Sequence, residues 1–387
     1  MLDGEQGPAV AKSMELLVAL GEVFEAERLV SVDSAHISGV SYKNLGEAGL
    51  EFLEEQARLG AKVKIRSTLN PAGMDLDIWG EMGVSESFAL SQLRAIKAFE
   101  SMGIEPTCTC TPYLVGHIPS LGTQISWSES SAVAYSNSVL GARTNRESGP
   151  TTIASAVTGL TTLYGYRLEE NRRPGKIVEV KAELRNRLDY SALGYLTGTL
   201  LGTTVPFFKG IKNPDIESLK ALGASCATSG GIALYHIEGV TPEAGDVSDS
   251  LMRLERITVD DFDLENVISR LTSGVEDPVF CLGCPHCSLK EIKEAVNIIK
   301  DKTVTRDLWI FTSRGVYDEA DKRGYIDIIK EAGGRVFRDT CMVVAPLSEI
   351  GWNEVATNSL KCAHYMSSMG FKTQVLPAEF MLEISCK

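Results

Sequence analysis

Two parts of this 387-residue chain alternate between strand-like and helix-like segments, and this alternation limits the possible folds more than any other feature. In the first part, strand patterns at residues 28–33, 62–67 and 105–113 are separated by amphipathic helical patterns at residues 45–59 and 87–102. Parallel strands need a crossover connection, usually a helix. The order therefore predicts a largely parallel sheet with helices on its faces.

The last third of the chain repeats this plan. Strands are predicted over residues 278–282, 308–312 and 335–344, with helices over residues 289–300 and 317–331. The chain is thus expected to be an α/β protein with two α/β halves.

We expect an N-terminal α/β region at residues 1–150, a middle connecting region at 151–274 and a C-terminal α/β region at 275–387. Two stretches, residues 148–166 and 190–208, lack charge over about the length of a membrane span. Both are rich in Thr and Gly, which carry little apolar mass. They are predicted to form buried small-residue helices, and no membrane association is expected.

The net charge and the cysteine content further restrict the possible functions of the chain. Lys and Arg number 38 against 51 Asp and Glu, for a net charge of -13, which disfavours a nucleic-acid or anionic-membrane partner. The polar, acidic start lacks the features of a secretory signal. Nine cysteines in such a chain indicate reduced thiols, metal ligands or nucleophiles rather than a disulfide framework, so we expect a cytoplasmic protein.

The densest chemical motif is Cys281-Leu-Gly-Cys284-Pro-His-Cys287, two overlapping Cys-x-x-Cys steps. This spacing lets thiolates hold a metal ion or an iron–sulfur cluster, but further ligands must come from elsewhere in the chain. Cys110 and Cys341 are candidates, because each ends or closely follows a predicted strand, where ligand sites of parallel sheets lie. Three thiolates would leave one iron open to water or substrate.

Other readings of this motif stay open. Cys281 is expected to be a buried strand residue, and Cys287 can be a helix-start residue with no ligand role. His286 is a possible ligand, but a hydrogen-bonding or substrate-contacting imidazole is at least as compatible with its position.

The chain lacks the glycine-rich phosphate motifs of nucleotide-binding proteins. Its predicted strand ends instead run into polar loops of small residues, around residues 35–42 and 67–73, whose amides and hydroxyls suit carboxylate or phosphate oxygens. Asn70 can orient a substrate hydroxyl. Glu129 suits acid–base work or a substrate hydroxyl, with a helix-start position as the alternative, and Lys361 could balance an anionic substrate.

Together these motifs resemble one family. Gly-Cys284-Pro-His-Cys-Ser, Thr-Cys110-Thr-Pro-Tyr, Asp-Thr-Cys341, the opening Asp3-Gly-Glu-Gln-Gly and Ser67-Thr-Leu-Asn-Pro-Ala-Gly occur in one chain. In combination they resemble the catalytic chain of the aconitase X family over essentially its whole length. The resemblance implies an aconitase-like fold with α/β halves around a central cluster cleft.

The resemblance also implies roles for individual residues. Cys110, Cys284 and Cys341 match the ligands of an iron–sulfur cluster, either [4Fe-4S] or [3Fe-4S]. Glu129, Ser130 and His286 are our predicted catalytic residues. The residues in segments that look like the substrate site are Gly39, Val40, Ser41, Asn70, Pro71, Glu129, Ser130 and Lys361.

Within the family, a chain without a fused swivelling domain is similar to the archaeal-type large subunits. These imply an iron–sulfur hydro-lyase that converts (R)-5-phosphomevalonate to trans-anhydromevalonate 5-phosphate, in an alternative mevalonate route to isoprenoids. Longer, fused members act on cis-3-hydroxy-L-proline. Because the base that removes the α-proton comes from a swivelling domain in the wider superfamily, we expect a small swivel-domain partner that closes the cleft.

Four other functions remain compatible with the residues. The chain could be a related iron–sulfur dehydratase or isomerase of another hydroxy acid, including cis-3-hydroxy-L-proline. It could be a non-catalytic scaffold stabilised by a metal, or an electron carrier. A cysteine-nucleophile enzyme would keep its activity after iron removal and lose it on thiol alkylation.

Overall fold

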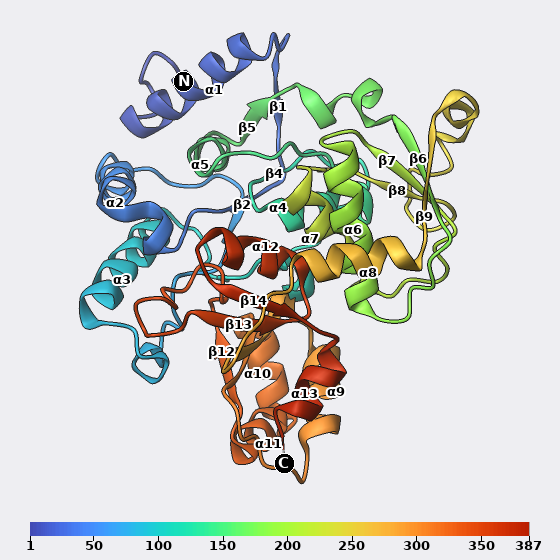
Figure 1. Cartoon of the computed structure of the whole chain (residues 1–387). Coiled ribbons are helices and arrows are strands. Elements are labelled where there is room, and N and C mark those ends of the chain that lie inside the picture. The colour runs from blue at the N-terminus through green and yellow to red at the C-terminus, as the bar shows by residue number, and fades with distance from the viewer. Residues whose placement is uncertain (387) are drawn as a thin grey trace.

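The computed structural model describes residues 1–386, without the side chains of residues 248–250. The last third forms a five-stranded sheet in the order β12-β11-β10-β13-β14, in which every neighbouring pair is parallel (Figure 1). Its strands are β10 (Val279–Cys287), β11 (Leu308–Thr312), β12 (Arg335–Arg338), β13 (Glu354–Thr357) and β14 (Lys372–Val375).

Helices cover both faces of this sheet, because its strands carry apolar side chains on alternate sides. Along β11, Ile310 packs into one apolar cluster, whereas Trp309 and Phe311 pack into another on the opposite face. The helices of this region are α9 (Leu289–Ile299), α10 (Arg314–Lys322), α11 (Tyr325–Ala332), α12 (Leu360–Ser368) and α13 (Ala378–Ile384).

The first part of the chain forms a three-stranded parallel sheet, β3-β2-β4, with β2 in the centre. A separate antiparallel pair joins β1 to β5. The strands are β1 (Leu29–Ser31), β2 (Ser34–Ile37), β3 (Arg66–Leu69), β4 (Ser126–Trp127) and β5 (Leu160–Thr162). The helices are α1 (Pro8–Val23), α2 (Tyr42–Arg58), α3 (Glu86–Ser101), α4 (Ser130–Ser138) and α5 (Gly149–Thr158).

The middle of the chain, for which only small-residue helices were predicted, also contains a four-stranded parallel sheet, β8-β7-β6-β9. These strands are short and lie within apolar or weakly patterned sequence, so no alternation marked them. The strands are β6 (Lys176–Val180), β7 (Pro206–Lys209), β8 (His236–Ile237) and β9 (Arg256–Val259), and the helices are α6 (Arg187–Leu201), α7 (Ile216–Ser229) and α8 (Asp261–Arg270).

Several predicted boundaries were wrong. The stretch predicted as a strand at residues 105–113 runs beside β3 without becoming a strand, because Pro106 and Pro112 have no amide hydrogen to donate. The predicted helix at residues 317–331 is two helices, separated at Gly324, whose φ of 74° is left-handed. The central N-terminal strand lies at β2, just after the predicted strand at residues 28–33.

The two uncharged stretches lie inside the protein. The first forms α5 and β5, and the second falls on α6 and β7, with most of their side chains buried. Within residues 1–386, no helix combines the length and the apolar character needed to cross a bilayer.

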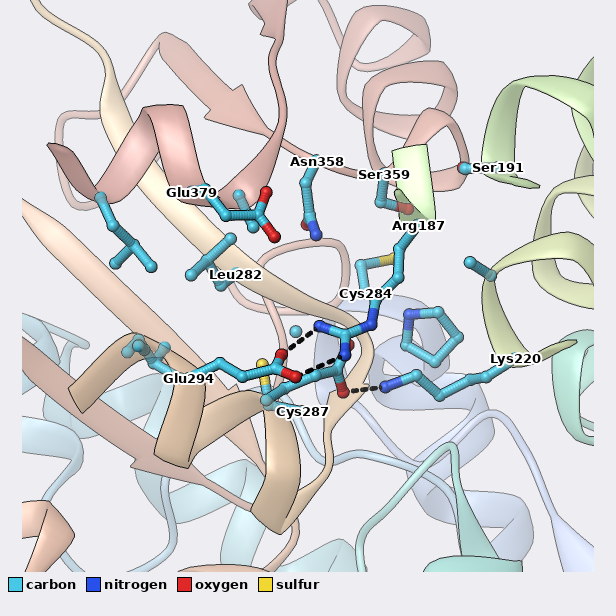
Figure 2. Close-up of a pocket in the computed structure, with 18 of the residues that line it drawn as sticks. Arg187, Ser191, Lys220, Leu282, Cys284, Cys287, Glu294, Asn358, Ser359 and Glu379 are labelled. Atoms are coloured by element: carbon cyan, nitrogen blue, oxygen red, sulfur yellow. Dashed lines mark hydrogen bonds and ion pairs between the residues drawn. The ribbon is translucent and has the colours of Figure 1, made fainter. Parts of the chain in front are cut away.

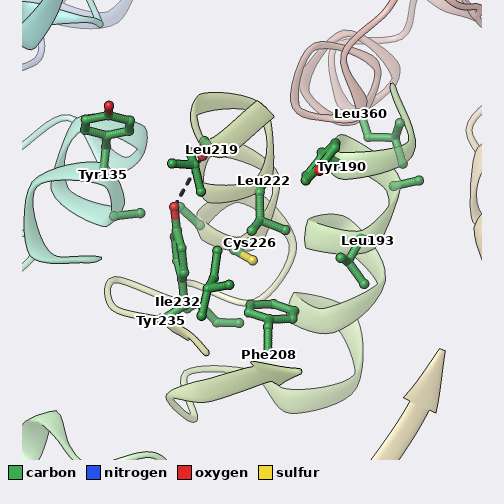
Figure 3. Packing of buried hydrophobic residues seen from close by; sticks show 14 of the residues in the cluster. Tyr135, Tyr190, Leu193, Phe208, Leu219, Leu222, Cys226, Ile232, Tyr235 and Leu360 are labelled. Carbon is green, nitrogen blue, oxygen red and sulfur yellow. Dashed lines mark hydrogen bonds between the residues drawn. The ribbon is translucent and has the colours of Figure 1, made fainter. Parts of the chain in front are cut away.

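Two glycines of α6 let this helix approach α7 closely (Figure 3). A Cβ atom on Gly194 would lie 2.3 Å from the Leu222 carbonyl oxygen, and one on Gly198 would lie 2.1 Å from Ser229 Oγ. The close approach lets Leu193 pack with Leu222 and Cys226 in one apolar cluster. The small residues in the stretch thus serve helix packing.

We expect Gly194→Ala to destabilise the fold by about 1–3 kcal/mol, because the methyl group would collide with backbone atoms that cannot move independently. Gly274→Ala is the matched control, since a Cβ there meets nothing within 4 Å. The measurement is the free energy of unfolding by urea for both variants. Equal stability of the two variants would contradict the packing argument.

Candidate active site

A cavity of about 390 Å³ lies where the N-terminal sheet meets the C-terminal sheet. Its walls come from loops that follow β2, β3, β4 and β12, from the segment after α3 that carries Cys110, from the bulged end of β10, and from helices α2 and α12. The carboxyl ends of parallel strands are the usual place for ligand sites. The lining residues are Ser38, Gly39, Asn44, Asn70, Pro71, Cys110, Ser128, Glu129, Ser130, Cys284, Cys341, Val343, Val344, Lys361, Tyr365 and Met369.

Cys110, Cys284 and Cys341 all line this cavity, although they are far apart in the sequence. Cys284 follows Gly283, which has a positive φ of 109°. A Cβ atom at Gly283 would lie 2.2 Å from the Phe311 carbonyl oxygen, so no other residue fits there. The register of β10 against β11 shifts between Leu282 and Cys287. The bulge turns the Cys284 side chain out of the strand and toward the cavity.

The protonation of these thiols bears on what they can hold. Burial raises the pKa of Cys110 well above its ordinary value and that of Cys341 to about 12. The nearby Cys362 thiol, and then burial, raise the pKa of Cys284. The three thiols therefore stay neutral without a cation, and only a bound positive group would make all three thiolates stable here.

The three thiols are suitable donors for an iron–sulfur cluster. Among residues 1–386, no group of three His, Cys, Asp or Glu side chains is arranged around one point that could hold a metal ion. Three soft sulfur donors from separate loops instead face one cavity, as a group with several iron atoms requires.

Three further cysteines close to these ligands in sequence lie in hydrophobic cores. Cys281 is buried on one face of the five-stranded sheet, and Cys287 packs on the other face. Cys108 lies in the core of the N-terminal region. None of the three lines the 390 Å³ cavity.

His286 is fully buried between the cysteine loops rather than on the cavity wall. Its backbone N–H donates to Cys110 Sγ at 3.2 Å. Its ring nitrogens contact Thr109 Oγ1 at 3.1 Å and the Thr340 carbonyl oxygen at 2.8 Å. Burial lowers the pKa of His286 to about 4, so the imidazole is neutral and ties together the three loops that carry the cysteines.

A buried ion pair joins Glu129 to Lys361 on the wall of the cavity. Lys361 Nζ lies 2.7 Å from Glu129 Oε1 and also donates to Ser131 Oγ at 3.2 Å. Glu129 Oε2 accepts hydrogen bonds from Ser131 Oγ and from the Ala132 amide, both at 2.6 Å. Glu129 is thus the N-cap of α4 as well as a cavity residue.

Both Glu129 and Lys361 are ionised in this pair. Burial acts to raise the pKa of Glu129, but the Lys361 ammonium and the hydrogen bonds outweigh it and hold the pKa below its ordinary value. Burial likewise acts to lower the pKa of Lys361, and the Glu129 carboxylate more than reverses this. Glu129 therefore presents a carboxylate, which accepts hydrogen bonds and protons, rather than a carboxylic acid.

The remaining predicted residues divide into two groups. Gly39, Asn70, Pro71 and Ser130 line the cavity. Val40 and Ser41 do not: the Val40 side chain is buried in the N-terminal core, and Ser41 Oγ donates to the Val344 carbonyl oxygen at 2.8 Å. Ser41 thereby fixes the loop after Cys341 against the loop after β2.

Comparisons with known proteins identify the family of this chain. Models of the first, second and third domains of aconitase X match residues 1–170, 174–269 and 278–387. The chain belongs to the aconitase X family. The crystal structure of aconitase X from Thermococcus kodakaraensis in its holo-form is similar with a TM-score of 0.93 and 44% identity, over 99% of this chain and 97% of that chain.

Curated relatives of this aconitase X chain are named dehydratases. The phosphomevalonate dehydratase large subunit of Methanothermobacter thermautotrophicus is 50% identical over 95% of this chain and 92% of its own length. The cis-3-hydroxy-L-proline dehydratase of Pseudomonas aeruginosa is 35% identical over 94% of this chain, which spans only 65% of that protein. The fold expected from the resemblance is confirmed, and the family as a whole implies an iron–sulfur cluster.

A second, smaller cavity of about 40 Å³ shares Cys284 with the first and is shown in Figure 2. Arg187 of α6 donates to Glu294 of α9, with Nη2 3.0 Å from Oε1. Lys220 of α7 pairs with Glu291 and donates to the His286 carbonyl oxygen at 2.8 Å. In this aconitase X chain, helices α6 and α7 of the middle region thus hold the segment around Cys284 through these contacts.

Sequence reasoning missed several cavity residues. Tyr365 and Met369 lie four and eight positions after Lys361, so the helical repeat of α12 could have placed them on the same face. Ser38 lies within the predicted polar loop at residues 35–42 but was not singled out, and its amide donates to Ser128 Oγ at 2.7 Å. Val343 and Val344 carried no chemical signal in the sequence.

Proposed function

We propose that this chain is the large, catalytic subunit of an iron–sulfur dehydratase that converts (R)-5-phosphomevalonate to trans-anhydromevalonate 5-phosphate. The observation that carries the proposal is the cavity itself, where three thiols and the Glu129–Lys361 pair meet. Relatives of 44–50% identity that match almost the whole chain are named phosphomevalonate dehydratase large subunits. The hydroxyproline dehydratases share less identity.

Cys110, Cys284 and Cys341 would hold the cluster, as [4Fe-4S] or [3Fe-4S]. When bound, the cluster supplies a Lewis acid that polarises the substrate hydroxyl and carboxylate. Gly39, Asn70, Pro71 and Ser130 would bind and orient the substrate on the cavity wall, with Val40 and Ser41 shaping the loop behind Gly39. Lys361 would hold Glu129 as a carboxylate.

In this scheme the substrate loses its tertiary hydroxyl and the proton on the carbon next to its carboxylate, together one water molecule. Glu129 accepts a hydrogen bond from the substrate hydroxyl, and Ser130 beside it completes the polar wall. His286 keeps the cysteine loops in register through both ring nitrogens. This assigns His286 a positioning role.

We infer a small partner subunit with a swivel domain, which would close the cavity and supply the base for the α-proton. The naming of the relatives as large subunits supports this partner. We also place the reaction in the cytoplasm. The nine cysteines are all free thiols in the described residues, as suits a reducing compartment.

The test is turnover by anaerobically reconstituted protein, followed by NMR, with and without the small subunit. We expect loss of water from (R)-5-phosphomevalonate only when both chains and the cluster are present. A parallel assay with cis-3-hydroxy-L-proline is the control, and we expect no turnover there. The substrate assignment would be overturned if the complex with a bound cluster dehydrated cis-3-hydroxy-L-proline, or if it dehydrated neither compound.

A further inference from the structure

A buried chain of two imidazoles and one hydroxyl lies behind the cavity wall. His36 of β2 places Nδ1 2.8 Å from Thr68 Oγ1 of β3. The same Thr68 oxygen lies 2.9 Å from His117 Nδ1. The Trp127 ring packs edge-on against both imidazoles. The function proposed above uses none of these three polar groups.

The protons of this chain have only two possible arrangements. Burial lowers the pKa of His36 to about 4 and that of His117 to about 3, so each imidazole is neutral and carries one N–H. Among the described residues, Thr68 Oγ1 contacts only these two nitrogens, so its single hydroxyl proton goes to one imidazole and its oxygen accepts from the other. The surroundings of the Nε2 atoms of His36 and His117 decide between the two proton arrangements.

The outer nitrogen of His36, Nε2, is buried and has no hydrogen bond of normal geometry to any described residue. Asn70 Oδ1 is also buried without a hydrogen bond to any described residue, although Asn70 itself lines the cavity. The two groups lie on one face of the sheet, because His36 pairs with Thr68 across β2 and β3, Asn70 follows Thr68 by two residues, and the Asn70 amide donates to the Ile37 carbonyl oxygen at 2.8 Å. An amide oxygen can only accept, so a hydrogen bond between the two groups requires the proton on His36 Nε2.

We propose that His36 Nε2–H donates to Asn70 Oδ1 and thereby turns the Asn70 NH₂ group into the cavity, where it binds a carboxylate or phosphate oxygen of the substrate. His36 is then a positioning residue that acts through Asn70. Thr68 donates to His36 Nδ1, and His117 Nδ1–H donates to Thr68. The inference rests on the proposed function in one respect, that Asn70 contacts the substrate.

The kinetic test is a double-mutant cycle on the complete holoenzyme. We expect His36→Phe to raise KM about tenfold, the effect of one hydrogen bond to a charged group, with little change in kcat or iron content. His36→Gln keeps an amide donor near the position of Nε2 and should recover most of the loss. In an Asn70→Ala background, His36→Phe should have almost no further effect.

The matched control is His236→Phe, which removes a buried imidazole of β8 that bonds the Arg172 carbonyl. We expect its effect on KM to be small and to add to that of Asn70→Ala. Additive effects of His36→Phe and Asn70→Ala would show that His36 is only structural and would overturn the proposal.

A second measurement does not depend on turnover. The chain has five histidines, so nitrogen NMR of the histidine-labelled holoprotein can assign each tautomer, with His36→Gln identifying the His36 signals. We expect the Nε2–H tautomer at His36 and the Nδ1–H tautomer at His117. The Nδ1–H tautomer at His36 would overturn the amide orientation, whatever substrate the enzyme turns over.

Discussion

Cys110→Ser, Cys284→Ser and Cys341→Ser should each lose iron and reduce turnover more than about 100-fold, the loss that even supporting residues around a metal can cause. The three thiols line one cavity, and their raised pKa values mean that only a bound cation stabilises the thiolates. A serine hydroxyl is a harder and weaker ligand for iron–sulfur iron. Iron and sulfide per chain, the electron paramagnetic resonance signal and turnover are the measurements.

Two variants of the same kind are the controls. Cys226→Ser changes a thiol in the apolar cluster between α6 and α7, and Cys386→Ser changes one near the C-terminus. We expect both to keep iron and turnover, although Cys226→Ser should lower thermal stability because it buries a hydroxyl. A full iron content in any of the first three variants would remove that residue from the ligand set.

Lys361→Met should cost about 3–5 kcal/mol of folding stability and reduce kcat/KM by about 100- to 1,000-fold, because it leaves the Glu129 carboxylate buried without a partner. The pKa of Glu129 should then rise, since burial would no longer be opposed by the ammonium. Thermal unfolding and steady-state kinetics measure the two effects. Arg94→Met, which breaks an exposed pair with Glu54, should change neither appreciably.

The double variant Glu129→Gln with Lys361→Met separates stability from function. Replacing the carboxylate by a neutral amide removes the unpaired charge, so part of the stability should return while activity stays low. Recovery of activity in the double variant, or an unchanged melting temperature in Lys361→Met, would contradict a functional buried pair.

The pair also predicts a direction of pH dependence. The folded-state pKa of Glu129 lies below its unfolded value, so its stabilising contribution is complete above the unfolded value and is lost as the pH falls through the folded pKa. The folded-state pKa of Lys361 lies above its unfolded value, so its contribution is lost only as the pH rises through the folded pKa. Wild-type protein should lose this stabilisation in acid, and the double variant should not.

The sequence alone determined the α/β class, the small-residue helices and the cysteine motif, because these depend on residues close together in the chain. Strand and helix patterns have fixed local periods, and overlapping Cys-x-x-Cys steps identify themselves by spacing. Nine of the residues predicted for the site do line the cavity: Gly39, Asn70, Pro71, Cys110, Glu129, Ser130, Cys284, Cys341 and Lys361.

Only the tertiary structure decided which of these residues act together. Glu129 and Lys361 are 232 positions apart, and no local pattern links a carboxylate on one helix start to an ammonium on another. The same is true of His286 between the cysteine loops and of His36 behind Asn70, whose partners lie on separate strands or loops. The physical reason is that hydrogen bonds and ion pairs depend on distance in space, which packing of the three parallel sheets sets.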